Sequence, residues 1–376
     1  MDIGQDRLVL MMRVSKLRVL VISIVLALLG IVIAVRLYGT RGYEKYTDSF
    51  FDTFDTVVVV VAYNRSQEEF DAYFDKIHRR FQDLHKRYDI YHEYPGLNNL
   101  KTINDHAGVK PVKVDKEIID LILLGKQLYS QTAGKTNIAM GAVLRIWHEY
   151  REAGRNNAEA AQLPPMEQLR AASEYTDIDK VIVDEANSTV YLADSEMSLD
   201  VGALAKGYAA ELVIQEMAAQ GLKSAMISAG GNIRAIGKPL DGIRERWGVG
   251  IQDPQQSIFS EDGLLDVVFI NDGAVVSSGD YQRYYVVDGK RYHHIIDPAT
   301  LMPAEYYHSV TVVAEGSGAA DYMSTELFLL PWPESRALAE ELGVEALWVM
   351  LDGTTQTTEG MREILRSQGA SGAARR

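Results

Sequence analysis

Hydrophobic positions recur along this chain with the two spacings that separate strands from helices. Residues 57–61 form an unbroken β-branched run, which predicts a strand buried on both faces. From Glu68 onward, apolar and aromatic residues return every three or four positions, which predicts an amphipathic helix. Its apolar face consists of Phe70, Tyr73, Phe74, Ile77, Phe81 and Leu84. Such a stripe is usually part of a core, so no chemistry is assigned to it.

The rest of the chain mixes further helix and strand patterns. Two hairpins are predicted, one around the turn 184–188 and one around Asp288-Gly289, which joins 284–287 to 291–294. Short apolar runs bounded by turn residues predict strands at 225–228, 247–251, 266–270 and 309–314. Helices are predicted at 118–129, 166–173, 320–330 and 333–342, the last with Gly343 as its C-cap. The mixed order favours an α+β fold with mixed or antiparallel sheets over a regular parallel βαβ array.

The first 36 residues have the pattern of a membrane anchor. An uncharged run at 19–35 follows a basic flank, and as a helix it would span roughly 26 Å, near the lower limit for a bilayer. No small-residue cleavage pattern follows the run, which favours an uncleaved signal-anchor. The basic flank predicts that the N-terminus lies inside and the body of the chain outside the cytoplasm. A buried core helix is the alternative interpretation. The flank carries Arg7, Arg13, Lys16 and Arg18.

Composition excludes several classes of protein and site. The net charge of −14 argues against a nucleic-acid binder, which needs an excess of Lys and Arg. The chain has no cysteine, which excludes disulfides, thiolate zinc sites, iron–sulfur clusters and a cysteine nucleophile. Any metal must therefore be held by oxygen or imidazole. After the anchor, residues 37–50 are predicted to be a linker, 51–366 a single domain and 367–376 a disordered tail.

The first candidate site lies between residues 200 and 237. A polar turn leads into a predicted helix that begins near Ala203, and a buried strand follows that ends in a glycine pair. Free N–H groups at the helix start would face a ligand above Asp200, and Lys206 could reach a phosphate one turn further on. In the alternative interpretation, Asp200 is an ordinary N-cap and Lys206 a solvated surface residue. This segment alone does not decide between them.

Two further clusters carry possible chemistry. His293 and His294 are adjacent on a predicted strand, so only one of them can face a site shared with Asp297. His294 is a candidate general base, although a lone histidine is more often structural. Asp321 and Thr325 share one helix face with Ser324 beside them, which makes an oxygen cluster suited to Mg²⁺. An ordinary capped helix turn is the alternative for this cluster.

Six blocks, taken in this order, resemble the ApbE family of FAD:protein FMN transferases. Together they cover nearly all of the chain from about Phe51 to Met350. The blocks are D-V-G-A-L-A-K-G-Y at 200–208, G-G-N-I-R-A-I-G at 230–237, W-G-V-G-I-Q-D-P at 247–254, S-G-D-Y-Q-R-Y-Y at 278–285, H-I-I-D-P at 294–298 and A-D-Y-M-S-T at 320–325.

The resemblance implies a Mg²⁺-dependent, membrane-associated enzyme that moves FMN from FAD to a Thr or Ser hydroxyl of a partner flavoprotein and releases AMP. The implied acceptors are membrane redox-pump subunits or flavin carriers. His294 matches the family histidine thought to assist the transfer, and Asp297 is a second candidate base. The implied metal ligands are the Ala203 carbonyl, Asp321 and Thr325. The implied FAD contacts are Phe54, Tyr91, Lys135, Thr136, Asn137, Asp200, Lys206 and the backbone of Ile295.

The chain departs from the family pattern at several positions. It has no lipidated cysteine, Thr136-Asn137 replaces a common Phe-Asp pair, and Leu301 stands where a glycine often follows Asp-Pro. Ser324 occupies a position that is acidic in some members. Two alternatives stay open beside FMN transfer. One is an FAD pyrophosphatase in which water replaces the protein hydroxyl, and the other is a non-catalytic, membrane-tethered flavin-binding protein.

Overall fold

A computed structural model describes residues 42–256, 260 and 263–373. The anchor predicted for residues 1–36 lies outside this part of the chain. Within it, no helix combines the length and the apolar character needed to cross a membrane. The described residues form an α+β fold, as predicted, built on antiparallel sheets.

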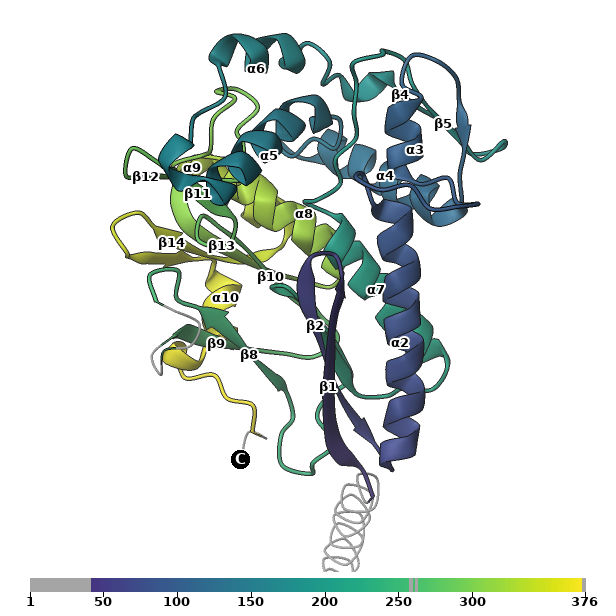
Figure 1. Ribbon diagram of the computed structural model, residues 1–376. Helices are drawn as coiled ribbons and strands as arrows, with labels where there is room; N and C mark the ends of the chain where they lie inside the picture. The colour runs from purple at the N-terminus through teal and green to yellow at the C-terminus, as the bar shows by residue number, and fades with distance from the viewer. Residues whose placement is uncertain (1–41, 257–259, 261–262, 374–376) are drawn as a thin grey trace, which may run out of the picture.

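An eight-stranded antiparallel sheet runs through the centre of the molecule, in the order β1-β2-β6-β7-β10-β13-β14-β15 (Figure 1). Its strands are β1 Glu44–Thr53, β2 Thr56–Asn64, β6 Ala225–Ala229, β7 Asn232–Ile236, β10 Ala274–Gly279, β13 Tyr307–Ala314, β14 Glu345–Met350 and β15 Thr355–Thr357. The predicted strand at 57–61 falls within β2. It is not buried on both faces throughout, because Val57 is 53% exposed whereas Val58 and Val60 are buried.

Strand β1 corrects the predicted domain boundary. The residues 44–50, predicted as linker, belong to this strand and pair with β2 along its length. The strand lies at the sheet edge and is mostly exposed, so its sequence lacks the apolar alternation of a half-buried strand.

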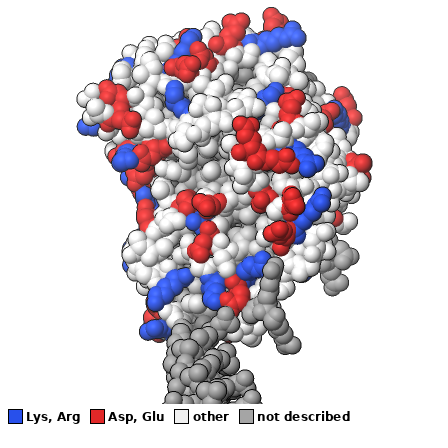
Figure 2. All heavy atoms as spheres, turned by 180° about the vertical axis from the view of Figure 1, so that it is seen from behind, with Lys and Arg blue, Asp and Glu red and all other residues white. Residues whose placement is uncertain are grey.

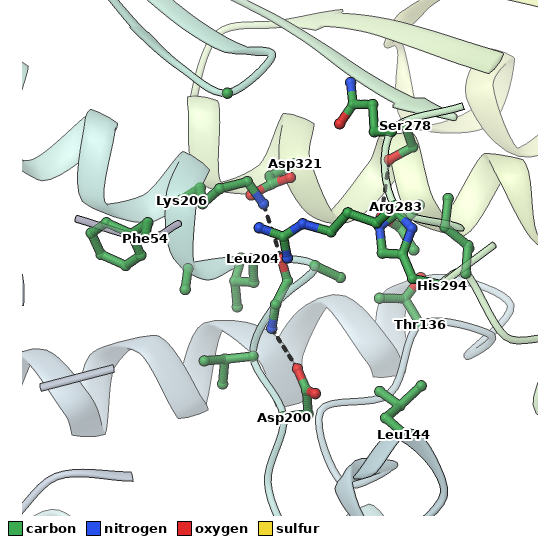
Figure 3. A pocket seen from close by; sticks show the side chains of 18 of the residues that line it. Phe54, Thr136, Leu144, Asp200, Leu204, Lys206, Ser278, Arg283, His294 and Asp321 are labelled. Carbon is green, nitrogen blue, oxygen red and sulfur yellow. Dashed lines mark hydrogen bonds between the residues drawn. The ribbon is translucent and has the colours of Figure 1, made fainter. Parts of the chain in front are cut away.

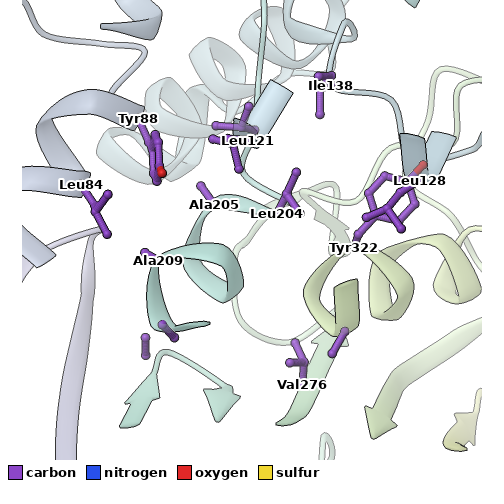
Figure 4. Close-up of a cluster of buried hydrophobic side chains, with 14 of the residues drawn as sticks. Leu84, Tyr88, Leu121, Leu128, Ile138, Leu204, Ala205, Ala209, Val276 and Tyr322 are labelled. Atoms are coloured by element: carbon purple, nitrogen blue, oxygen red, sulfur yellow. The ribbon is translucent and has the colours of Figure 1, made fainter. Parts of the chain in front are cut away.

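Helices cover one face of this sheet and enclose the main core (Figures 1 and 4). The aromatic stripe predicted from Glu68 onward is confirmed, since Phe70, Ile77, Phe81 and Leu84 are all buried on the inner face of α2. Ser66 caps this helix, with its side chain accepting a hydrogen bond from the Glu69 N–H. The covering helices are α2 Gln67–Tyr88, α7 Ala205–Ala219, α8 Ser317–Phe328 and α9 Trp332–Leu342, the last ending at Gly343 with φ +65°.

A second hairpin, β8 Trp247–Gln252 with β9 Leu264–Ile270, packs with α10 Glu359–Ile364 on the opposite face and forms a separate apolar cluster.

The C-terminal segment returns to this hairpin. The Gly372 carbonyl accepts a hydrogen bond from the Glu245 N–H at 2.6 Å, and Arg244 forms a bridge with Ala373. The disordered tail predicted for 367–376 is therefore wrong for residues 367–373, and the last three residues lie outside the described chain. On the face seen in Figure 2, acidic and basic side chains are interspersed.

The remaining elements form a cap above one end of the sheet (Figure 1). Both predicted hairpins are confirmed here. The elements are α3 Leu100–Asp105, β3 Val112–Lys113, α4 Lys116–Gln131, α5 Gly141–Asn156, α6 Met166–Ser173, β4 Val181–Asp184, β5 Thr189–Leu192, β11 Tyr284–Val287 and β12 Lys290–His293. Short 3₁₀ turns also occur along the chain, at Ala158–Ala160, Ile178–Lys180 and Arg366–Gln368.

Helices α7 and α8 cross at Gly207, which lies in the first turn of α7. A Cβ atom at this position would lie 2.3 Å from the Ser317 carbonyl oxygen and 2.6 Å from the Asp321 Cβ. The Gly207 N–H instead donates a hydrogen bond to Asp321 Oδ2 at 2.9 Å. The absence of a side chain therefore permits both the close helix crossing and the buried hydrogen bond.

We predict that Gly207→Ala destabilises the protein despite the higher helix propensity of alanine, because the new methyl group has backbone on one side and Asp321 on the other. The expected loss in the free energy of unfolding is about 1–3 kcal/mol, measured by urea denaturation. Gly316→Ala is the matched control, since its nearest neighbour is Glu211 Oε2 at 3.8 Å. Equal stability of the two variants would contradict the crowding argument.

Candidate functional site

One cavity of about 690 Å³ lies where the β1–β2 turn, the starts of α5 and α7, and α8 meet. This volume falls in the range of about 300–1,000 Å³ typical of small-molecule sites. Twelve of the thirteen residues predicted for the site line the cavity, although they come from segments far apart in the sequence. These residues are Phe54, Tyr91, Lys135, Thr136, Asn137, Asp200, Ala203, Lys206, His294, Ile295, Asp321 and Thr325.

The turn before α7 forms one wall of the cavity (Figure 3). Asp200 Oδ1 accepts a hydrogen bond from the Gly202 N–H at 2.8 Å, and Lys206 Nζ donates to the Gly202 carbonyl at 3.2 Å. Asp200 therefore shapes the turn and does not cap the helix, which begins at Ala205 and has Leu204 in the N-cap position. The N-cap alternative for Asp200 is therefore wrong, and the helix begins two residues after the predicted start near Ala203.

Asp321 is a buried carboxylate that lines the cavity, with 4% of the residue exposed. Burial raises its pKa, and the nearby Lys206 and the hydrogen bond from Gly207 oppose that rise. On the next helical turn, the Thr325 hydroxyl lies 3.2 Å from Ser278 Oγ, which also lines the cavity. Ser324, by contrast, is fully buried outside the cavity lining, where its Oγ bonds to the Asp321 carbonyl at 2.9 Å.

The predicted metal ligands supply one carboxylate, from Asp321, together with the Thr325 hydroxyl and the Ala203 carbonyl. Among the described residues, no group of three His, Cys, Asp or Glu side chains could hold a metal. The one carboxylate, the hydroxyl and the carbonyl oxygen suit Mg²⁺, which is commonly bound through one or two carboxylates and completes its shell with waters and substrate phosphates.

The two adjacent histidines have different surroundings, as predicted, although strand β12 ends at His293 and His294 lies in the bend that follows. His293 is buried, with Nε2 at 2.8 Å from the Ala304 carbonyl and its ring edge-on to Phe328. His294 lines the cavity, and its buried Nδ1 has no hydrogen-bond partner in the described chain. Burial lowers the pKa of His294 well below the ordinary value, and the positive charge of Arg283 lowers it further. His294 is therefore a neutral imidazole at neutral pH.

Asp297 departs from its predicted role at the reacting centre. Its carboxylate is buried, lies outside the cavity lining, and accepts hydrogen bonds from Lys135 Nζ at 3.2 Å and the Ala299 N–H at 2.9 Å. The structure thus gives Asp297 the task of holding the loop after β12 and orienting Lys135. In the same loop, Leu301 has φ +59°, a left-handed conformation that explains why glycine is favoured there.

The loop with Lys135, Thr136 and Asn137 is fixed to α8. Glu326, which is fully buried, accepts the Lys135 and Thr136 N–H groups at 3.1 and 2.5 Å. The Asn137 side chain is used within the protein, since it donates to the Thr176 carbonyl at 2.8 Å and accepts from the Ala139 N–H at 2.8 Å. Of these three loop residues, only Thr136 has a buried side-chain polar atom, its hydroxyl, without a partner in the described chain.

Aromatic rings line two parts of the cavity wall. Phe54 lies in the two-residue turn between β1 and β2, where Phe54 and Asp55 both have positive φ, 53° and 50°. Both positive values match a type I′ turn, which normally carries Asn or Gly, so Phe54 adopts a strained backbone at the cavity wall. Its ring packs edge-on to Phe81 and His85. In the other part, Tyr91 is half exposed with its ring centroid 4.9 Å from that of His148.

Two arginines at the cavity are absent from the sequence-based site. Arg283 extends across the cavity between Lys206 and His294 (Figure 3). Within the described chain it has no hydrogen bond or ion pair. Arg151 lines the same cavity with its guanidinium 2.9 Å from His148 Nδ1. The signal for Arg283 was present in the S-G-D-Y-Q-R-Y-Y block, where a loop arginine stands between two strands.

Comparison with known proteins identifies the family. The sequence model of the ApbE family matches residues 54–348, well over half of the chain. The chain belongs to the ApbE family. An FAD:protein FMN transferase of Treponema pallidum is 34% identical over 280 residues, or 71% of this chain and 75% of the relative. One from Klebsiella pneumoniae is 31% identical over 273 residues, or 72% of this chain and 81% of the relative.

The fold of this ApbE-family protein is also found in solved structures. The crystal structure of an ApbE protein from Thermotoga maritima superimposes with a TM-score of 0.75 at 29% identity. The alignment covers 85% of this chain and 99% of the other. The family match spans strands β2 to β13, helices α2 to α9 and every residue that lines the cavity.

The neutral state of His294 leads to a prediction of pH-dependent stability. An unfolded histidine has a pKa near 6.5, and the folded pKa of His294 is lower. The unfolded state therefore binds more protons, and the free energy of unfolding should fall as the pH drops through about 6.5. His148 and His293 have lowered pKa values for the same reason, burial, so His294→Asn should flatten this fall without abolishing it.

Urea denaturation between pH 8 and pH 5 measures this effect, and an NMR titration of ring-labelled histidine gives the pKa directly. The His294→Asn spectrum assigns the resonance. Titration of His294 at or above the ordinary value would show that the cavity does not keep the ring neutral.

Proposed function

We propose that this protein transfers FMN from FAD to a Ser or Thr hydroxyl of an acceptor protein and releases AMP. One observation carries the proposal: twelve residues chosen from sequence blocks far apart in the chain surround a single cavity. Relatives at 34% and 31% identity are FAD:protein FMN transferases. The alternatives, an FAD pyrophosphatase and a flavin carrier, differ in where the FMN ends up, and the first experiment below separates them.

The cavity offers complementary groups to each part of FAD. The turn at Asp200–Lys206 and the unpaired Arg283 supply positive charge and polar backbone for the pyrophosphate. The rings of Phe54 and Tyr91 offer apolar faces for the flavin and adenine ring systems. The unpartnered Thr136 hydroxyl and Asn232 Oδ1 can bind polar atoms of the ligand, since buried polar atoms normally have partners.

In the proposed reaction, the acceptor hydroxyl oxygen forms a bond to the FMN-side phosphorus. The bond from that phosphorus to the bridging oxygen breaks, and AMP leaves with the electron pair. The neutral His294 takes the hydroxyl proton. Proton transfer to a well-placed base raises the rate by about 10²–10⁴-fold. Lys206 and Arg283 stabilise negative charge that spreads over the phosphoryl oxygens. No covalent enzyme intermediate is needed.

We also propose that the reaction uses Mg²⁺, held by Asp321, Thr325 and the Ala203 carbonyl. The hard oxygen donors and the buried carboxylate of Asp321 fit this ion. When bound, the ion would neutralise charge on the pyrophosphate.

The acceptor is proposed to be a membrane redox-pump subunit or a flavin carrier. For the location, we propose an uncleaved N-terminal anchor at residues 1–36 with the catalytic domain outside the cytoplasm. This proposal is supported by the basic flank and the uncharged run of the sequence.

The deciding experiment incubates the full-length protein in detergent with FAD, Mg²⁺ and purified soluble domains of redox-pump subunits and flavin carriers. We expect equal amounts of AMP and of covalent flavin, the latter seen as fluorescence on the denatured acceptor in a gel. AMP without covalent flavin would instead establish a pyrophosphatase. Bound FAD without AMP release would establish a carrier.

Asp321→Asn should lower the flavinylation rate by at least 100-fold, because the amide cannot supply a charged ligand to a cation. Chelation of Mg²⁺ from the wild-type protein should have the same effect. Asp352→Asn is the matched control, because Asp352 is exposed and lies outside the cavity lining. A metal-dependent rate that is unchanged in Asp321→Asn would exclude this carboxylate as a ligand.

Arg283→Gln should lower kcat/KM for FAD by about 10–100-fold, the cost of one or two charge-assisted hydrogen bonds to phosphate. Arg283→Lys should recover part of the activity, since it restores the charge without the planar fork. Arg291→Gln serves as control, because Arg291 is exposed and stacks on Tyr284 outside the cavity. Steady-state AMP release measures all three. Wild-type kinetics in Arg283→Gln would remove the arginine from the site.

A further inference from the structure

Two exposed apolar side chains flank the turn of the β1–β2 hairpin. Phe51 is 82% exposed and Val57 is 53% exposed. In the strand register, Phe50 pairs with Val58 and Thr53 pairs with Thr56, so Phe51 lies opposite Val57 at a β-bulge. We call these two residues the hairpin patch.

The hairpin patch adjoins the cavity. The residues between its two members include Phe54, Asp55 and Thr56, all of which line the cavity. The Val57 carbonyl also accepts the Gly230 N–H at 3.3 Å, and Gly230 is itself a lining residue. A chain bound on the patch would therefore lie beside the turn that forms the cavity wall.

Contacts with α2 hold the hairpin rigidly. Phe50 stacks on His78 of α2 at 4.3 Å between ring centroids. Asp52 accepts hydrogen bonds from His78 Nε2 at 2.8 Å and Gln82 Nε2 at 2.6 Å. A partner that binds here would meet a preformed surface and lose little affinity to ordering of the hairpin.

Charge and area decide between possible occupants. Asp48 and Asp55, both exposed, flank the patch, and carboxylates disfavour an anionic lipid surface. Two side chains are far short of the roughly 800 Å² per partner of a stable dimer interface. A short segment that enters the cavity needs only a small contact. On the outer side of β1, no strand of the described chain pairs with it, so its backbone is open to an extended segment.

We propose that the hairpin patch docks the acceptor protein, binding apolar side chains of the extended segment that carries the target Ser or Thr. The proposal rests on the proposed FMN transfer. Docking on Phe51 and Val57 places the segment alongside β1, with its hydroxyl directed past Phe54 into the cavity. The patch binds the acceptor and takes no part in FAD binding.

The test compares Phe51→Ser/Val57→Ser with Val109→Ser/Ile243→Ser, a control pair that is 72% and 75% exposed at sites outside the cavity lining. The full-length variants are assayed with the acceptor domain that the wild-type protein flavinylates. We expect the patch variant to raise the acceptor KM at least tenfold. FAD affinity, melting temperature and kcat at saturating acceptor should stay within twofold of wild type. The control pair should match wild type throughout.

An acceptor KM equal to that of the control pair would overturn the docking proposal and leave FMN transfer intact. An unchanged KM with lost binding to phosphatidylserine vesicles would assign the patch to a membrane. An unchanged KM with a change from dimer to monomer in sedimentation would assign it to a second copy. Absence of covalent flavin with the wild-type protein would overturn both FMN transfer and acceptor docking.

Discussion

The crossing of α7 and α8 at Gly207 is the contact on which the site depends. It buries the Asp321 carboxylate, whose removal from water would cost several kcal/mol without compensation. The Gly207 N–H and the nearby charge of Lys206 provide that compensation. The same crossing brings Ala203, in the turn before α7, and Lys206, in α7, into the lining of the same cavity as Thr325 of α8. Packing of two helices and assembly of the oxygen donors are thus one event.

The electrostatics of the cavity depend on ligands as well as on protein groups. Burial is the main reason that protonation of His294 is disfavoured. The positive charges of four neighbours disfavour it further: Arg283, His293, Arg151 and Lys206. An anion bound to Arg283 would offset part of this positive field, so the imidazole would become more basic when the pyrophosphate is in place. His294 would then be most basic when the pyrophosphate is bound. In the empty cavity, the imidazole would take up a proton less readily.

Sequence patterns predicted the elements whose side chains are sorted by burial. The α2 stripe and both hairpins were found because apolar spacing and turn residues record them directly. Strand β1 and residues 367–373 were missed because they are held mainly by backbone pairing, which leaves no apolar period. For the site, motif order identified the lining residues, whereas Asp297 was misassigned because its partner Lys135 lies 162 positions away. Arg283 was missed because an unpaired charge is visible only in three dimensions.

Strand β1 also has a mechanical consequence. Its ten residues cover roughly 33 Å from Glu44 to the turn at the cavity wall. If the chain is tethered before Glu44, this stiff hairpin acts as a spacer that sets how far from the attachment point the cavity can stand. Acceptors would then be selected by distance as well as by contact, because only segments that extend as far from the attachment point as the cavity gain the high local concentration of a shared surface.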